Sequence, residues 1–187
     1  MLIKMPPRYF VFLLSFFFVS HAYAKGSLQI GMGFYSLSAK VGDRSTALSG
    51  PGHFELVYNY PFTTKIEGYV GYSIVNESLL GGDRGFGPQI GIKFSYWGHA
   101  QNSEWKRPEF DLKIQRSFSP YFMIGFHQRQ YQSTRSSYSG PGLGAGFVTD
   151  YYPKISFFAE FLTVLLNGGG GATATENSII VGAYLRI

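Results

Sequence analysis

The sequence contains residue types that could hydrolyse an ester or amide bond, but it does not space them for that chemistry. Such a hydrolase needs a histidine base, an acid that orients the base and a serine nucleophile within hydrogen-bond reach. The candidate bases are His53 and His127, the candidate acids are Glu55 and Glu160, and the candidate serines are Ser73 and Ser133. No serine stands at a short fixed spacing from either histidine, and no Gly-x-Ser-x-Gly sequence occurs. The spacing therefore favours a chain without a catalytic site.

The same residues give little support for a metal or a cofactor. His53, His99 and His127 lie far apart, without the short spacing that brings ligands together on a helix or hairpin, and the chain has no cysteine. The glycine run at 168–171 lies between two predicted strands and not before a helix, so no helix dipole is available to bind phosphate. We therefore expect no metal and no cofactor.

The first 24 residues have the three parts of a secretory signal peptide. Lys4 and Arg8 provide the positive start, residues 9–19 (YFVFLLSFFFV) form an uncharged apolar core, and Ala22-Tyr23-Ala24 supplies the small-x-small cleavage pattern. An uncleaved anchor is the alternative, but the core is shorter than the ~20 residues of a spanning helix. We predict export by the Sec route, cleavage after the second of these alanines, and one mature domain at 25–187. A lipoprotein is excluded because no cysteine is available for acylation.

The composition is typical of a chain in contact with lipid. Charged residues make up 14% of the chain and aromatic residues 18%, whereas a soluble domain has about 25% charged residues. After the leader, no apolar stretch reaches the ~18 residues that would predict a membrane helix. A closed barrel is the other structure that satisfies every backbone polar group in lipid. The 16 Lys and Arg against 11 Asp and Glu do not cluster as in a nucleic-acid-binding face, so we expect no nucleic acid as a partner.

Eight segments of the mature chain carry apolar residues at every second position. Membrane strands have this pattern because one face meets lipid and the other meets the lumen. The segments are 28–35, 53–60, 66–74, 88–96, 122–129, 143–151, 157–165 and 179–187. Glycine recurs on the predicted inner face, where a narrow barrel has little room for large side chains. The sequence therefore predicts an all-β fold, an eight-stranded antiparallel up-and-down transmembrane β-barrel, with a soluble β-sandwich as the alternative.

A ninth alternating segment, 109–116, is predicted not to cross the membrane. Nine strands would leave the two chain ends on opposite sides, and bacterial barrels have even strand numbers. We therefore place residues 98–119 in an extended periplasmic connection, with 109–116 as a non-spanning extension of the fourth and fifth strands.

The lengths of the other connections predict the orientation of the barrel. Short connections are expected on the periplasmic side and longer polar, glycine-rich loops outside the cell. The short ones are 61–64 and 151–154, and the long ones are 40–50, 77–85, 132–140 and 167–176. Arg44, Arg84 and Arg135 lie in the first three outer loops, where a guanidinium group could bind lipopolysaccharide phosphates. Solvated loop tips are the simpler interpretation of these arginines.

The alternation places seven ionisable side chains inside the predicted barrel. They are Glu55, Glu67, Lys93, His127, Arg129, Glu160 and Arg186. Because charges inside a narrow barrel are costly unless they are paired, we interpret them as a network of ion pairs and hydrogen bonds that closes a polar lumen. A small pore lined by the same residues is the alternative, although eight strands leave an interior just wide enough for side chains.

The leader, the eight amphipathic segments and the alternation up to the last residue resemble the small outer-membrane barrels typified by OmpX, OmpW and the membrane domain of OmpA. The resemblance implies location in the outer membrane, contact with its lipid and lipopolysaccharide, insertion by the barrel-assembly machinery, and a monomer. In that family the last residue is commonly Phe, whereas here it is Ile187. The expected function is a structural or surface-interaction role without catalysis. The alternatives are a hydrolase acting on lipid A or phospholipid and a narrow channel for small solutes.

Overall fold

The structure, a computed structural model of the whole chain, describes residues 26–77, 83–97, 103–107, 110–114, 118–132, 136–152 and 155–187. Residues 1–24, for which a cleaved leader is predicted, lie outside these ranges. The strands are β1 (Ser27–Val41), β2 (Arg44–Pro61), β3 (Ile66–Asn76), β4 (Arg84–Ser95), β5 (Ser103–Arg107), β6 (Phe110–Ile114), β7 (Phe118–Tyr131), β8 (Ser137–Tyr152), β9 (Ile155–Gly168) and β10 (Thr173–Arg186). A single 3-10 turn, η1 (Gly169–Gly171), joins β9 to β10. Among the described residues, no helix is long and apolar enough to cross a membrane.

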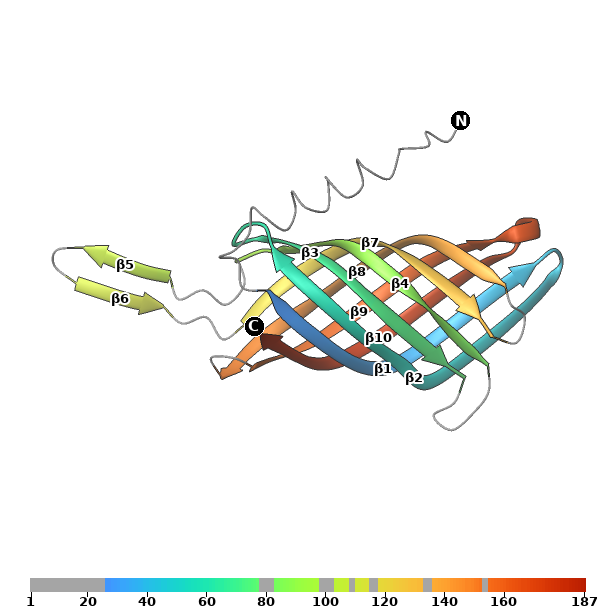
Figure 1. Cartoon of the computed structure of the whole chain (residues 1–187), viewed down its shortest axis with the longest axis horizontal. Coiled ribbons are helices and arrows are strands. Elements are labelled where there is room, and N and C mark those ends of the chain that lie inside the picture. Colours follow the sequence, from blue (N-terminus) through green and yellow to red (C-terminus); the bar gives the residue numbers. More distant parts are fainter. Residues whose placement is uncertain are drawn as a thin grey trace, which may run out of the picture.

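Eight of the strands close into a barrel in the order β1-β10-β9-β8-β7-β4-β3-β2 (Figure 1). Each pair of neighbours is antiparallel, and the closing ladder between β1 and β10 runs from Ser27↔Arg186 to Lys40↔Thr173. This ladder needs a glycine at position 33, because a Cβ atom there would collide with the carbonyl oxygen of Ile179 on β10. The predicted eight-stranded up-and-down barrel is confirmed.

The outer face of the wall is apolar, as the alternation predicts. Large hydrophobic side chains on all eight strands point outward and are at least a third exposed. Examples are Ile30, Met32, Phe34, Leu56, Val70, Ile90, Ile124, Phe126, Leu143, Phe161, Leu165, Ile179 and Val181. A continuous apolar belt of this kind would be costly in water and is stable against lipid.

The connections divide the barrel into two ends. We call the end at which β1 starts and β10 finishes, with the 62–65 turn, the terminal end, and the opposite end the loop end (Figure 1). Two of the long outer loops predicted from the sequence are wrong. The 40–50 segment is mostly strand, with β1 joined to β2 through a tight turn in which Gly42 has a φ of 58°. Likewise, most of the 167–176 segment belongs to β9, η1 and β10. Their polar, glycine-rich sequences indicated loops, but their backbones pair in ladders beyond the apolar belt.

The ninth alternating segment does not cross the barrel wall. Residues of this segment form β6, which pairs with β5 in a separate two-stranded sheet, drawn beyond the terminal end in Figure 1. The barrel closes without it, because β4 pairs directly with β7. The prediction of a non-spanning segment is confirmed, but the prediction that it extends the fourth and fifth strands is wrong, since β5 and β6 pair with each other. Residues 109, 115 and 116 lie outside the described ranges.

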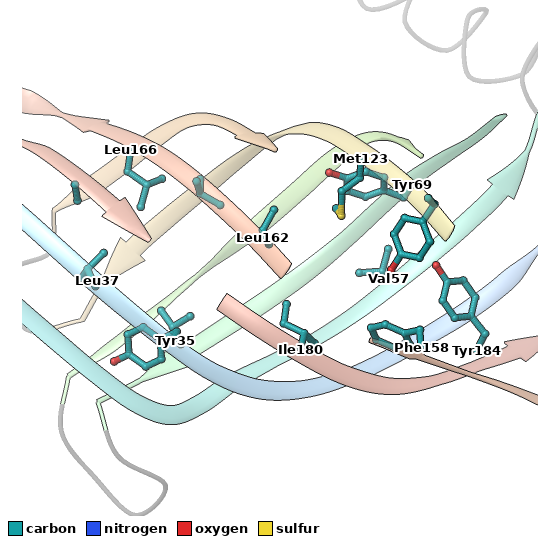
Figure 2. Close-up of a cluster of buried hydrophobic side chains, with 14 of the residues drawn as sticks. Tyr35, Leu37, Val57, Tyr69, Met123, Phe158, Leu162, Leu166, Ile180 and Tyr184 are labelled. Atoms are coloured by element: carbon teal, nitrogen blue, oxygen red, sulfur yellow. The ribbon is translucent and has the colours of Figure 1, made fainter. Parts of the chain in front are cut away.

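The interior is less polar than the sequence predicted. A cluster of buried hydrophobic side chains runs along the barrel, with Leu37 and Leu166 toward the loop end and Phe158 and Tyr184 toward the terminal end (Figure 2). The lumen is therefore polar in part and apolar in part, and much of its apolar part comes from β9. Its inward side chains include Leu162, Val164 and Leu166, all at most 1% exposed.

The two faces of β1 exchange polarity toward the loop end. On β1 the outward residues change from Met32 and Phe34 to Ser36 and Ser38, while the inward residues change from Gln29 to Leu37. The same strand therefore has an apolar outside and a polar inside in one part, and the reverse in the next. The reversal indicates where the wall leaves lipid and enters water, because the hydrophobic face turns inward once water covers the outside.

Candidate functional site

Two clusters of polar side chains lie inside the barrel. The first, the lysine cluster, comprises Gln29, Glu55, Gln89, Lys93, Tyr121, Glu160 and Tyr184. The second, the arginine cluster, comprises His53, Arg129, Glu176 and Ser178. All of these side chains are at most 5% exposed. They point inward because they alternate with the outward-facing residues of their strands.

Lys93 on β4 is the centre of the lysine cluster. Its Nζ donates hydrogen bonds to Gln29 Oε1 at 2.5 Å and to Tyr184 OH at 2.8 Å. It lies 3.8 Å from Glu160 Oε2. The same ammonium group is 5.2–5.4 Å from the centroids of three tyrosine rings, those of Tyr69, Tyr121 and Tyr184. Negative ring faces and oxygen acceptors replace the water that a buried ammonium group has lost.

The two carboxylates of the cluster are held by donors from other strands. Glu55 accepts hydrogen bonds from Gln29 Nε2 at 2.5 Å and from Gln89 Nε2 at 3.2 Å. Glu160 accepts from the Tyr121 hydroxyl at 2.6 Å and from Gln29 Nε2 at 3.4 Å. The cluster thus joins six strands, β1, β2, β4, β7, β9 and β10, across the lumen. Such cross-links can hold the strands in a single register.

The arginine cluster contains the most complete ion pair of the described residues. Arg129 on β7 donates from Nε to Glu176 Oε2 at 3.0 Å and from Nη2 to Glu176 Oε1 at 2.9 Å. Both side chains are fully buried. Two parallel N–H···O bonds match the planar guanidinium group to the carboxylate. On β2, His53 Nδ1 is hydrogen-bonded to Ser178 Oγ at 2.8 Å and lies 3.9 Å from Glu176 Oε1.

The structure places the seven predicted lumen residues as follows. Glu55, Lys93 and Glu160 meet in the lysine cluster, and Arg129 lies in the arginine cluster. Glu67 is buried and is the register partner of Lys93.

The other two are members of neither cluster. His127 is fully buried, with its ring over Gly142 of β8. Arg186 is half-buried at the terminal end and donates to Ser156 Oγ at 3.2 Å.

Several functional residues were not identified from the sequence. Glu176 was assigned to a loop, although it lies at the same inward parity as Tyr184 and Arg186 on β10; extending the alternation by a few residues would have placed it inside. Gln29 lies on a predicted inner face, but its amide is neutral, so a search for ionisable lumen residues does not include it. The sequence singles out His53 as a catalytic base or metal ligand, and not as a partner of Ser178.

The described residues do not assemble the base, acid and serine of a hydrolase. Ser178 and Glu176 both approach His53 at Nδ1, whereas a relay needs them on opposite ring nitrogens. Among the described residues, neither ring nitrogen of His127 has a hydrogen-bond partner, and the hydroxyl of Ser73 has none either. Ser133 lies outside the described ranges.

The remaining predicted contacts concern metals and the arginines of the outer loops. Within the described ranges, no group of three or more His, Cys, Asp or Glu is arranged to hold a metal ion. Arg44 and Arg84 are exposed at the first positions of β2 and β4, both at the loop end. Arg135 lies outside the described residues.

Comparison with known proteins identifies similar structures but no related sequence. No protein-family model matches the chain, and no curated protein matches it. The neisserial surface protein A (NspA) superposes with a TM-score of 0.58 at 10% identity, covering 87% of this chain and 97% of that one. The N-terminal β-barrel domain of Pseudomonas aeruginosa OprF gives a TM-score of 0.52 at 10% identity, covering 88% and 99%. The resemblance to small outer-membrane barrels is therefore confirmed as one of architecture, and the chain has their eight-stranded fold.

Proposed function

We propose that this protein is a sealed outer-membrane barrel that acts as a structural or surface-interaction protein, without catalysis and without conductance. The observation that carries the proposal is the filling of the lumen. Arg129, Tyr121, Lys93, Leu162, Leu166 and Ile180 project into it, and each is less than 2% exposed. Because charged and apolar side chains together close the interior along its length, the pore alternative is the less favoured one.

The proposed location is the outer membrane, with the loop end facing the cell exterior. The apolar belt and the fold support a membrane location, and the predicted signal peptide supports export. Insertion would use the barrel-assembly machinery, and the protein would be a monomer. The terminal end, with the start of β1, the end of β10 and the β5–β6 hairpin, would then face the periplasm.

The proposed contacts with the environment lie at the loop end. Outward residues there are polar and exposed, among them Ser36, Ser38 and Gln128. Arg44 and Arg84 are exposed at the same end and could pair with lipopolysaccharide phosphates.

Orientation can be tested with single cysteines, because the natural chain has none. Asp43→Cys at the loop end should react with a membrane-impermeant maleimide in intact cells. The matched variant Thr64→Cys, exposed at the terminal end, should react only after the outer membrane is permeabilised. Labelling of Thr64→Cys in intact cells would contradict the proposed orientation.

Sealing can be tested by recording from planar bilayers that contain the folded mature chain. Heat-modifiable migration on a gel verifies folding in the same sample. We expect no steady current above the lipid background. Reproducible single-channel steps from the folded protein would contradict the sealed lumen and favour the channel.

A further inference from the structure

Four fully or almost fully buried side chains where the two polar clusters meet carry polar atoms that have no partner among the described residues; one of the four belongs to each cluster and the other two to neither. Among the described residues, the atoms without a hydrogen bond include His53 Nε2, Ser73 Oγ, Gln89 Oε1 and both ring nitrogens of His127. The four side chains are at most 2% exposed. We call these four residues, on β2, β3, β4 and β7, the polar arc.

The ladders place the members of the polar arc side by side. Gln89 on β4 is the register partner of His127 on β7. Ser73 on β3 is paired with Gly87, two residues from Gln89. Ser73 is also paired with Glu55 on β2, which is two residues from His53. Inward side chains at directly paired and diagonal positions of neighbouring strands are close enough to share a contact. The unpartnered atoms therefore line one continuous patch of the inner wall.

This patch has the properties of a hydrated surface. Buried polar atoms are almost always hydrogen-bonded to protein or to ordered water. A neutral imidazole has one donor and one acceptor nitrogen, and both needs of His127 are unmet. Glycines share the inner face with the arc, among them Gly71, Gly87 and Gly91, and the side chains of Val57 and Tyr69 lie against two of them.

We infer that ordered water molecules bind to the polar arc and bridge the lysine cluster to the arginine cluster. Gln89 already donates to Glu55, and His53 is already bonded to Ser178, so the arc lies at the junction of both networks. Water fits because it donates and accepts, as this mixture of hydroxyl, amide oxygen and imidazole requires. An anion fits less well, because the guanidinium group of Arg129 is occupied by Glu176.

The bound water is enclosed and does not form a pathway. Toward the loop end the interior is apolar, with Leu37 and Leu166 buried there (Figure 2). Toward the terminal end Phe158 and Tyr184 pack edge to face, with ring centroids 5.4 Å apart. The polar arc is thus an internal hydration site within a sealed barrel.

The direct test is an experimental structure of the mature chain at a resolution that shows water. We expect water density within hydrogen-bond distance of at least three of the five unpartnered atoms. A dry arc, or side chains that rotate to bond one another directly, would overturn the inference.

A second test uses His127→Phe, which keeps an aromatic ring but removes both nitrogens. If water bridges the arc, this variant deprives the water and its other partners of hydrogen bonds, and the unfolding equilibrium constant should rise about tenfold. If the nitrogens are truly unpaired, the same change should leave stability equal or higher. Met123→Leu, an inward apolar change on the same strand, is the matched control and should leave the equilibrium constant unchanged within a factor of about three.

Discussion

The ion pair between Arg129 and Glu176 provides the sharpest test of how the interior is held together. In Glu176→Gln the guanidinium group stays buried and keeps a hydrogen-bond partner, but it loses its compensating charge. Both side chains are fully buried and the pair is bidentate, at 2.9 and 3.0 Å. Removing one partner of such a pair costs about 3–5 kcal/mol. Because 1.4 kcal/mol is tenfold, the unfolding equilibrium constant should rise by a factor of about 10² to 4 × 10³.

The double variant Arg129→Met with Glu176→Leu should behave differently. It removes both charges together and replaces them with apolar side chains, so no unpaired charge remains. Replacing a buried ion pair in this way is often neutral or stabilising. We therefore expect the double variant to recover most of the stability that Glu176→Gln loses. Asp43→Asn, at an exposed turn position, is the surface control and should change stability by no more than about 0.5 kcal/mol.

Urea titration in lipid vesicles, followed by tryptophan fluorescence, measures these changes. The chain has two tryptophans, and Trp97 lies at the terminal end beside Tyr96 and Phe118, so its emission should shift when the barrel leaves lipid. The reasoning is refuted if Glu176→Gln costs less than about 1 kcal/mol. It is equally refuted if the double variant loses as much stability as Arg129→Met and Glu176→Leu lose separately, added together.

Three further predictions concern closure, the lipid belt and the hairpin. Gly33→Val should prevent the β1–β10 ladder from closing, because its Cβ would meet the Ile179 carbonyl. Heat-modifiable migration on a gel should then be lost. The control Gly169→Ala, where a Cβ meets nothing within 4 Å, should migrate as the natural chain does. Ile124→Arg should destabilise the barrel by about 2–4 kcal/mol in vesicle titrations if that position is near the bilayer midplane, whereas Gln128→Arg on the same face of β7 should be nearly neutral. Replacing residues 98–117 with a short flexible linker should leave a folded, heat-modifiable barrel, because β4 pairs with β7 directly; failure of that variant to fold would mean that the β5–β6 hairpin supports the wall.

The inner and outer faces of the strands could be predicted from the sequence because lipid makes the pattern strict. Every second residue of 28–35, for example, must be apolar where it meets hydrocarbon, so a two-residue period identifies both faces. Parity then removed 109–116 from the wall, because a closed antiparallel barrel with both chain ends on one side needs an even number of strands. These arguments use only local periodicity and closure.

The partners of Arg129 could not be predicted in the same way. Arg129 and Glu176 are on strands that are not neighbours in the barrel, so local pattern carries no information on their contact. The segment around Glu176 is also polar on both faces, with Thr173, Thr175 and Asn177 alternating with the inward residues. Without apolar outward residues, a strand in water has no lipid signature, and the sequence there resembles a loop.

The reversal of polarity along β1 connects the buried charges to the membrane itself. Within the belt, an apolar side chain can face either the lipid outside or an apolar lumen inside. The hydrophobic effect then gives a strand no preference for which face turns inward. A charged or amide side chain gives that preference, because facing lipid would leave it unpaired. Lys93 and its partners, whose outward neighbours Ile92 and Phe94 are apolar and exposed, therefore specify orientation and register within the belt. Beyond Tyr35, where water covers the outside, Leu37 can specify the inside by burial alone. The lysine cluster is thus explained by the needs of a wall in lipid, and no substrate is required to account for it.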